Sequence, residues 1–297
     1  MRDPAVIRML PDGRRVHMND GPIDLIIDAN GTAHAIRAAY EAAARRFVSI
    51  LDELCADLPL LRRRSTPSSP EPSGSVARRM AAAVSPYCTE HFITPMAAVA
   101  GAVAEAILSE MTRVAELDRA YVNNGGDIAL HLTQHEHYGL GMAERPDSPS
   151  LLGSVQISAD NPVRGVATSG WRGRSFSLGI ADAVTVLAGT AAAADAAATV
   201  IANAVNLPGH PAILRVPANE IAPDSDLGAI PVTRDVGSLS VHDVDLALRN
   251  GQQLAGELRD RNLIHSAALC LQGQVRLVAS SQYAHEFDLS PKSLQHA

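Results

Sequence analysis

Three separated segments of the chain carry residue types suited to binding an anion or a cation. The first is VNNGGDIAL, in which Asn124, Gly125, Gly126 and Asp127 follow an apolar, strand-like stretch. Consecutive glycines expose backbone amides, and such a nest suits an anion or a ring carbonyl. The alternative is an ordinary β-turn, in which Asn and Asp side chains bond to their own backbone. The segment by itself leaves both interpretations open.

The second segment, residues 165–179, combines a hydroxyl-rich turn with an aromatic ring and two guanidinium groups. These residues are Thr168, Ser169, Gly170, Trp171, Arg172 and Arg174. Small hydroxyls beside guanidinium groups can receive phosphate or pyrophosphate, bidentately where the geometry allows. The alternative is a loop whose arginines pair with surface carboxylates.

The third segment is ADAVTVLAGTAAAADAAATVIANAV, a strand-like stretch that runs into an alanine-rich helical one. In a helix, Asp195 and Thr199 lie on one face, one turn apart. A carboxylate and a hydroxyl, with a backbone carbonyl from elsewhere, suit a hard cation such as Mg²⁺, which keeps waters and substrate phosphates as its other ligands. The alternative is helix capping, with Thr190 as the N-cap or Asp195 favoured by the helix dipole.

Hydrophobic spacing and turn residues predict the elements that position these segments. Small side chains dominate the helix over residues 96–111 and let a backbone or a ligand approach closely. In the first part of the chain the predicted elements are two short β segments within residues 5–27 that form a hairpin, an amphipathic helix over 32–54 packed on it, a mobile Pro/Ser-rich loop at 62–75, and helices over 76–84 and 96–111.

The second part of the chain alternates strands with helices in the same way. The predicted elements are strands within 119–132 and 154–166, a strand over 181–189 that leads into a helix over 191–206, two or three weaker strands from 215 on, a helix near 241–259, and a final strand over 267–281. This order of elements predicts an α+β or α/β fold in one compact unit.

Composition excludes several classes of protein. Apolar residues make up 46% of the chain and charged residues 19%, which predicts a folded globular protein. A net charge of −7 and an aromatic content of 3% argue against nucleic acid as a partner. Apolar stretches are too short or too interrupted to cross a membrane. The N-terminal residues show no signal-peptide pattern, so a cytoplasmic location is predicted.

In their order and spacing, the three segments and the helical stretch before them resemble the ApbE superfamily, whose characterised members are FAD:protein FMN transferases. The superfamily pattern is an Ala/Gly-rich helix, an N-x-GGD turn, a T-S-G turn, and S-V-T-V leading into an A-D-x-x-A-T helix. The matching stretches are ITPMAAVAGAVAEAI, VNNGGDI, VATSGWRGRSF and AVTVLAGTAAAADAAATV, within residues 93–205. The resemblance implies an α+β fold of two related α/β halves, forming a single domain over residues 1–297 with a flavin or nucleotide cleft between the halves.

The resemblance also implies a set of ligands and contacts. Asp195 and Thr199 would bind Mg²⁺, with a backbone carbonyl near Ala98 as the third ligand. The turns at residues 124–127 and 168–171 would lie against FAD, which is either substrate or bound ligand. The implied reaction transfers FMN from FAD to a protein acceptor.

Two departures from the superfamily pattern leave other functions open. The helix lacks the Lys and the aromatic residue of I-A-K-G-Y-A-V-D and keeps only the glycine and an acid, and the loop after the T-S-G turn is short and has no histidine. Arg172 and Arg174 are candidates to replace the lysine, so the candidate catalytic residues are Asp195, Arg172 and Arg174. The alternatives are a non-catalytic flavin-, nucleotide- or pterin-binding protein, and an enzyme acting on another phosphorylated or heterocyclic small metabolite. Assembly into a homo-oligomer is left open.

Overall fold

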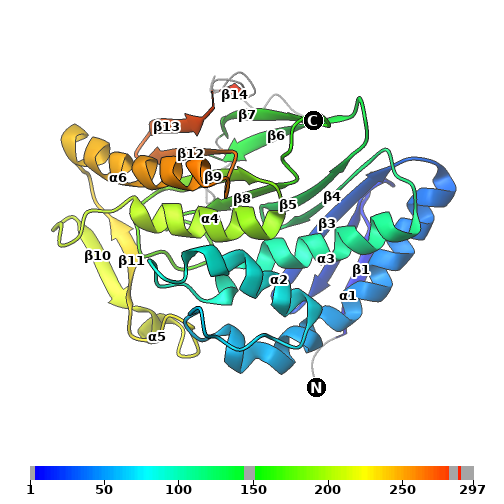
Figure 1. Cartoon of the computed structure of the whole chain (residues 1–297), viewed down its shortest axis with the longest axis horizontal. Helices are drawn as coiled ribbons and strands as arrows, with labels where there is room; N and C mark the ends of the chain where they lie inside the picture. Colours follow the sequence, from blue (N-terminus) through cyan, green and yellow to red (C-terminus); the bar gives the residue numbers. More distant parts are fainter. Residues whose placement is uncertain (1–3, 144–150, 281–286, 289–297) are drawn as a thin grey trace. The chain divides into compact units, whose positions relative to one another are not determined.

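The chain folds into a mixture of strands and helices, which confirms the predicted α+β class (Figure 1). The computed structural model describes residues 4–143, 151–280 and 287–288. Two compact units divide the chain: unit 1 comprises Met1–His137, Ser158–Ala167 and Gly189–Ala196, and unit 2 comprises Tyr138–Ile157, Thr168–Ala188 and Ala197–Ala297. The single domain predicted over residues 1–297 stays a prediction.

Unit 1 is built on an antiparallel sheet with the strand order β1, β2, β3, β4, β5 and the start of β8. The predicted hairpin of two β segments was wrong, because the segment VHMND between them is also a strand and pairs with both. Val16 and Met18 are buried, while His17 and Asn19 face outward, so only two apolar side chains mark this strand. The strands are β1 Val6–Met9, β2 Val16–Asp20, β3 Ile23–Asn30, β4 Arg119–Asn124, β5 Asp127–Leu132 and β8 Gly165–Ser169.

The first helix of unit 1 packs on this sheet, as predicted. It begins after Thr32, whose Oγ1 accepts the N–H of Ala35 at 3.2 Å, and it runs on to Leu61, beyond the predicted end. Phe47 and Ile50 on its apolar face are fully buried, and the helix contacts β2, β3 and α3. The predicted helix over 96–111 starts with a 3₁₀ turn. The helical elements are α1 Ala33–Leu61, α2 Ser75–Val84, η1 Ser85–Tyr87, η2 Pro95–Ala98 and α3 Val99–Val114.

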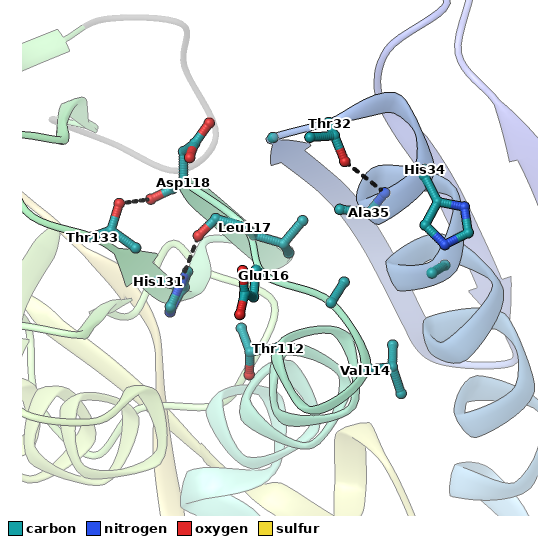
Figure 2. A pocket seen from close by; sticks show the side chains of 13 residues that line it. Thr32, His34, Ala35, Thr112, Val114, Glu116, Leu117, Asp118, His131 and Thr133 are labelled. Atoms are coloured by element: carbon teal, nitrogen blue, oxygen red, sulfur yellow. Dashed lines mark hydrogen bonds between the residues drawn. The ribbon is translucent and has the colours of Figure 1, made fainter.

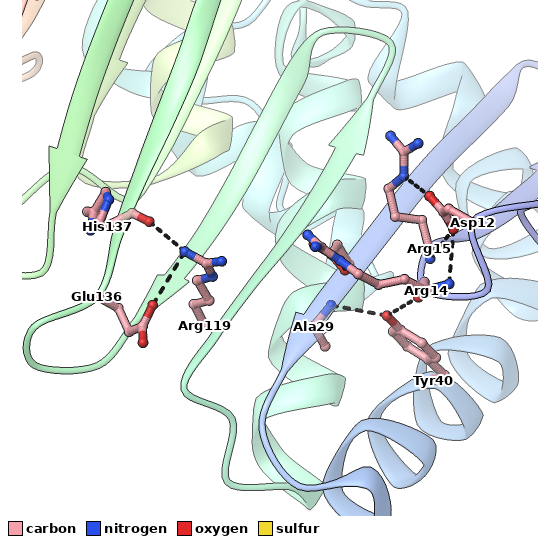
Figure 3. Close-up of polar contacts among 9 residues, drawn as sticks. Asp12, Arg14, Arg15, Ala29, Tyr40, Arg119, Glu136 and His137 are labelled. Carbon is pink, nitrogen blue, oxygen red and sulfur yellow. Dashed lines mark hydrogen bonds and ion pairs between the residues drawn. The ribbon is translucent and has the colours of Figure 1, made fainter. Parts of the chain in front are cut away.

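A tyrosine hydroxyl ties α1 to the sheet (Figure 3). It donates to the carbonyl oxygen of Arg14 at 2.8 Å and accepts the N–H of Ala29 at 3.1 Å. Burial, and then the negative charge of Asp28, raise the pKa of Tyr40 to about 12. The hydroxyl therefore keeps its proton at neutral pH. It holds α1 against β3 and against the turn between β1 and β2.

Polar contacts from α1 fix the end of the loop predicted at 62–75. The Asp57 carboxylate accepts the N–H of Gly74 at 2.7 Å and the hydroxyl of Ser73 at 2.9 Å. Glu53 accepts the N–H of Val76 at 2.9 Å, at the beginning of α2. The loop is non-helical as predicted, apart from its last residue, and its mobility stays a prediction.

Unit 2 contains an antiparallel group of strands in the order β9, β12, β13, with α6 packed on β12 and β13. The predicted final strand was wrong, because two strands replace it. They turn at Gln272 and Gly273, which have φ values of 45° and 78°. The strands and helices of this part of the chain are β6 His137–Ala143, β7 Leu151–Ser158, β9 Ala183–Ala188, α4 Ala191–Ala204, β10 Ile213–Pro217, α5 Ala218–Ile221, β11 Pro231–Val236, α6 Val241–Asp260, β12 Ser266–Leu271, β13 Gln274–Ala279 and β14 Phe287–Asp288.

His265, which precedes β12, is expected to make the stability of the protein depend on pH. Burial lowers the pKa of its imidazole below the ordinary value of 6.5. The unfolded chain therefore takes up a proton at a higher pH than the folded chain does. Stability is expected to fall as the pH drops through 6.5, and to stop falling below the folded-state pKa. Thermal denaturation across this range checks the prediction, and a His265→Gln variant should lose less stability on acidification. Equal losses in the two proteins would contradict it.

Within residues 4–143, 151–280 and 287–288, no helix is both long enough and apolar enough to cross a membrane.

Candidate functional site

Helices α3 and α4 cap each other where their first turns meet. The Asp195 carboxylate of α4 accepts the N–H of Gly101 on α3, with Oδ2 at 3.0 Å. In return, Glu105 of α3 accepts the N–H of Ala192 on α4, with Oε1 at 2.7 Å. Each carboxylate satisfies an amide that has no partner within its own helix, and each lies at the positive end of the other helix. The two acids therefore fix the crossing of α3 and α4.

Gly101 makes this close crossing possible. A Cβ atom at this position would lie 2.3 Å from the carbonyl oxygen of Ala191 and 2.7 Å from the backbone nitrogen of Ala192. Neither atom can move without displacing α4. Gly101 is therefore a position in this helix at which packing against α4 excludes a side chain.

The Gly-Gly turn lies beside the same end of α3. Residues 125 and 126 connect β4 to β5 and have φ values of 65° and 114°, which glycine adopts without strain. Gly126 donates its N–H to Asn123 Oδ1 at 2.8 Å, as the β-turn interpretation expected. The buried Asn124 side chain donates from Nδ2 to the carbonyl oxygen of Ala100 at 3.2 Å. The turn is therefore attached to the first turn of α3.

The negative charges of Asp195 and Asp127 repel each other beside the first turn of α3. Burial raises the pKa of the Asp195 carboxyl well above its ordinary range, and the negative charge of Asp127 raises it further. The backbone N–H groups of Gly101 and Ala100 act in the opposite direction. A carboxylate that is disfavoured by burial and by a like charge is the kind of group that a divalent cation stabilises.

The donor set is compatible with Mg²⁺. Among residues 4–143, 151–280 and 287–288, no cluster of three or more His, Cys, Asp or Glu side chains could hold a metal ion. A metal at Asp195 would therefore take its other ligands from hydroxyl or carbonyl oxygens, water and substrate phosphate, which Mg²⁺ accepts and softer metals do not favour. Thr199 follows Asp195 by one turn of α4, and the carbonyl of Ala98 belongs to the residue before α3.

The predicted T-S-G turn lies in unit 2, where a buried carboxylate organises it. Asp182 accepts Nε of Arg172 at 2.8 Å and Nε1 of Trp171 at 3.2 Å. It also accepts the backbone N–H of Gln272 at 2.6 Å. The guanidinium of Arg172 stacks on the Trp171 ring, with 4.2 Å between Cζ and the ring centroid. Arg172 is thus paired with a carboxylate. The alternative interpretation of this segment expected such a pair, but with a surface carboxylate, whereas Asp182 is buried.

The other residues of this turn differ in what they contact. The hydroxyls of Thr168 and Thr185 lie 2.9 Å apart. A Cβ at Gly170 would lie 2.4 Å from the carbonyl oxygen of Asp182, so this glycine is required by packing. Arg174 is exposed. The roles of Thr168, Ser169, Gly170, Trp171, Arg172 and Arg174 toward a ligand stay predictions.

The geometry thus joins some of the predicted residues and not others. Asn124 and Asp195 meet at Ala100 and Gly101 of α3, although as many as 94 residues separate the partners in sequence, and the charge of Asp127 acts on Asp195. Glu105 was noted only as the acid that the helix keeps, and its contact with Ala192 was not predicted. Asp182 was not predicted at all. An isolated acid next to an apolar strand is the one signal that could have indicated it.

A separate surface hollow of about 1020 Å³ lies in unit 1 between the start of α1 and the end of α3 (Figure 2). His131 Nε2 lies 3.1 Å from the carbonyl oxygen of Leu117, and the Thr133 hydroxyl donates to that of Asp118 at 2.8 Å. None of the three segments singled out in the sequence lines this hollow, so it is not part of the candidate site.

The fold and the site define an α+β protein of the ApbE-like class. A Gly-Gly-Asp hairpin and an alanine-rich helix that bears an aspartate both contact the first turn of another helix, α3. A family profile described as AbpE bacteria matches residues 7–277, and the chain belongs to this family.

Relatives of this chain include UPF0280 proteins of methanogens. That of Methanopyrus kandleri is 36% identical over 183 residues, which are 61% of this chain and 69% of the relative. That of Methanosphaerula palustris is 36% identical over 156 residues, which are 52% of this chain and 63% of the relative.

Two solved structures are also similar to this chain. The flavinyl transferase ApbE of Pseudomonas stutzeri in its apo form has a TM-score of 0.48 at 10% identity, with 96% of this chain and 98% of that chain covered. A flavin transferase ApbE from Vibrio cholerae has a TM-score of 0.39 at 11% identity, with 95% and 98% covered.

Proposed function

We propose that this chain binds FAD together with Mg²⁺ beside the first turn of α3 and transfers the FMN part to a hydroxyl of an acceptor. One observation carries the proposal: motifs far apart in the sequence meet at Ala100 and Gly101, where Asn124 arrives from the Gly-Gly turn and Asp195 from α4. Membership of the AbpE bacteria family supports the same conclusion.

Each residue would have a defined task. Asp195 would hold the cation with one carboxylate oxygen while the other keeps its bond to the Gly101 N–H. The Thr199 hydroxyl and the Ala98 carbonyl are the further oxygen ligands that we propose. The bound ion would offset negative charge on the pyrophosphate as the phosphorus reacts. The Gly-Gly turn, which has no side chains, would let the flavin approach the backbone closely.

The proposed reaction forms one bond and breaks one. The acceptor oxygen bonds to the phosphorus of the FMN part, and the bond from that phosphorus to the bridging pyrophosphate oxygen breaks. AMP leaves with the electron pair, and the proton of the acceptor hydroxyl passes to solvent. The chain orients the two phosphates in line with the attacking oxygen, which is the main contribution a protein makes to phosphoryl transfer.

A second function, binding without transfer, is favoured by one observation. Arg172, proposed as a replacement for the lysine that the helix lacks, is paired with the buried Asp182 and stacked on Trp171. A phosphate would have to displace that carboxylate to engage the guanidinium. Arg174 is the alternative, since it is exposed. Binding of a flavin, nucleotide or pterin without cleavage requires neither arginine.

Titration of FAD into the metal-stripped protein tests the proposal. Calorimetry with and without Mg²⁺ is expected to show binding only when Mg²⁺ is present, and the same samples with an acceptor should contain AMP. Binding without AMP would support the second function. Absence of binding in both conditions would contradict the transfer reaction and the flavin-binding form of the second function.

A further inference from the structure

A small hollow in unit 1 is rich in groups that attract an anion. It has a volume of about 310 Å³ and lies between α2, α3, β5 and the turn before α4. Ligand pockets usually span about 300–1,000 Å³, so this hollow suits a small molecule rather than a dinucleotide. The polar residues that line it are Arg79, Glu105, Ser109, Thr112, His131, Arg164 and Thr190.

The two arginines in the hollow differ in how their charge is balanced. Arg79 is paired with Glu105, with 3.2 Å between Nη1 and Oε2, and Glu105 is held by the N–H of Ala192 as well. Arg164 donates to three backbone carbonyl oxygens, those of Ala159, Asn161 and Val163, at 2.6 to 2.9 Å. In the part of the chain that the structure describes, no carboxylate pairs with Arg164.

A partly buried cation without a counter-charge is costly, and an anion from solution relieves that cost. Burial lowers the pKa of Arg164, in keeping with a guanidinium that has lost part of its hydration. The hollow carries an excess of one positive charge, although the whole chain has a net charge of −7. The excess is therefore local to this place in the fold.

Hydroxyl groups complete the set of donors. Ser109 is exposed, lines the hollow and accepts Nη2 of Arg79 at 3.3 Å, which leaves its own proton to donate. Thr190 accepts the N–H of Ala193 at 3.2 Å and also keeps its hydroxyl proton. Guanidinium and hydroxyl donors that converge on one space match the oxygens of a phosphate group.

We infer that this hollow binds a phosphate group, either as inorganic phosphate or as a small phosphomonoester, through Arg164, Arg79 and Ser109. None of the residues proposed to contact FAD or Mg²⁺ lines the hollow, although Glu105, which does, also caps α4 at the crossing that carries Asp195. Phosphate is thus expected to bind whether or not FAD does, and the inference does not rest on the proposed reaction.

Calorimetric titration with inorganic phosphate, and separately with glycerol 3-phosphate, tests this inference on the full chain. The wild type should bind phosphate saturably, and Arg164→Gln should weaken binding about tenfold or more, as the loss of a charged hydrogen bond predicts. Ser109→Asp should weaken it similarly, because a like charge then faces the anion. Tighter binding of glycerol 3-phosphate than of phosphate would identify a phosphomonoester as the ligand class, and equal binding would identify free phosphate.

A matched control separates binding from folding. Arg113→Gln, on α3 but outside the hollow, removes an exposed arginine paired with Glu110 and should leave phosphate affinity unchanged. Arg164 also holds the turn at 159–163, so thermal denaturation must show that its variant is folded. If Arg164→Gln does not fold, the Ser109→Asp variant, which changes an exposed position, provides the test. The inference is overturned by absence of saturable binding to the wild type, by unchanged affinity in Ser109→Asp, or by competition between phosphate and FAD for one site.

Discussion

An Asp195→Asn variant is expected to fold at least as stably as the wild type and to lose Mg²⁺-dependent binding and turnover of FAD by about 100-fold or more, equivalent to several kcal/mol of charge stabilisation. The amide oxygen of asparagine can still accept the N–H of Gly101, so the cap on α3 is kept. The substitution also removes the repulsion with Asp127 that raises the pKa of the carboxyl. What it takes away is the negative charge that the cation requires.

This combination of results distinguishes a metal ligand from a helix cap. If Asp195 only caps α3, Asp195→Asn should retain FAD binding, and Asp195→Ala should lose stability by about 1 kcal/mol. Glu110→Gln is the matched control, because it neutralises a half-buried acid on α3 whose carboxylate pairs with Arg113 and lies outside the candidate site. Thermal denaturation and FAD calorimetry, each with and without Mg²⁺, provide both measurements. Unchanged Mg²⁺ dependence in Asp195→Asn would exclude it as a ligand.

Most helices could be predicted from local pattern because their spacing is strongly periodic. The apolar positions of the helix over 32–54 became the buried face of α1, with Phe47 and Ile50 fully enclosed. The strand and helix within 181–206 became β9 and α4, as an apolar run followed by an alanine-rich stretch indicated. The errors concern strands, since β6 was not predicted, β2 was missed, and β12 and β13 were predicted as one strand. β2 has two apolar residues among five, and β12 and β13 are separated only by Gln272 and Gly273, which turn the chain.

The candidate site could be predicted as a set of motifs but not as a set of contacts. The order of the motifs indicated Asn124 and Asp195, and the structure shows that both bind the first turn of α3. Glu105 accepts the N–H of Ala192, 87 residues away in sequence, and Asp182 accepts the N–H of Gln272, 90 residues away. Local spacing carries no information about such pairs, because packing of whole elements brings them together. Arg172 illustrates the consequence, since a residue chosen for phosphate is paired with a buried acid.

A Gly101→Ala variant is expected to be destabilised by about 2–5 kcal/mol, because overpacking against a fixed backbone adds to the loss of two helix caps. The new methyl group would lie 2.3 Å from the carbonyl oxygen of Ala191, so α3 and α4 must separate. Separation lengthens the bond from Gly101 to Asp195 and the bond from Ala192 to Glu105. FAD binding should be lost together with stability, since the candidate site lies at this crossing.

A glycine-to-alanine substitution at a second helical position, Gly256, should have the opposite effect on stability. Gly256 is also inside a helix, α6, but a Cβ there meets no atom within 4 Å. Gly256→Ala should therefore stabilise the protein by about 0.5–1 kcal/mol, through the higher helix propensity of alanine and the lower entropy of the unfolded chain. Chemical denaturation of both variants measures the difference. Sequence propensity alone assigns the two glycines the same effect, so a destabilised Gly101→Ala beside a stabilised Gly256→Ala would demonstrate that the contact with α4 decides the outcome. A Gly101→Ala protein as stable as the wild type would contradict the close crossing of α3 and α4 on which the site depends.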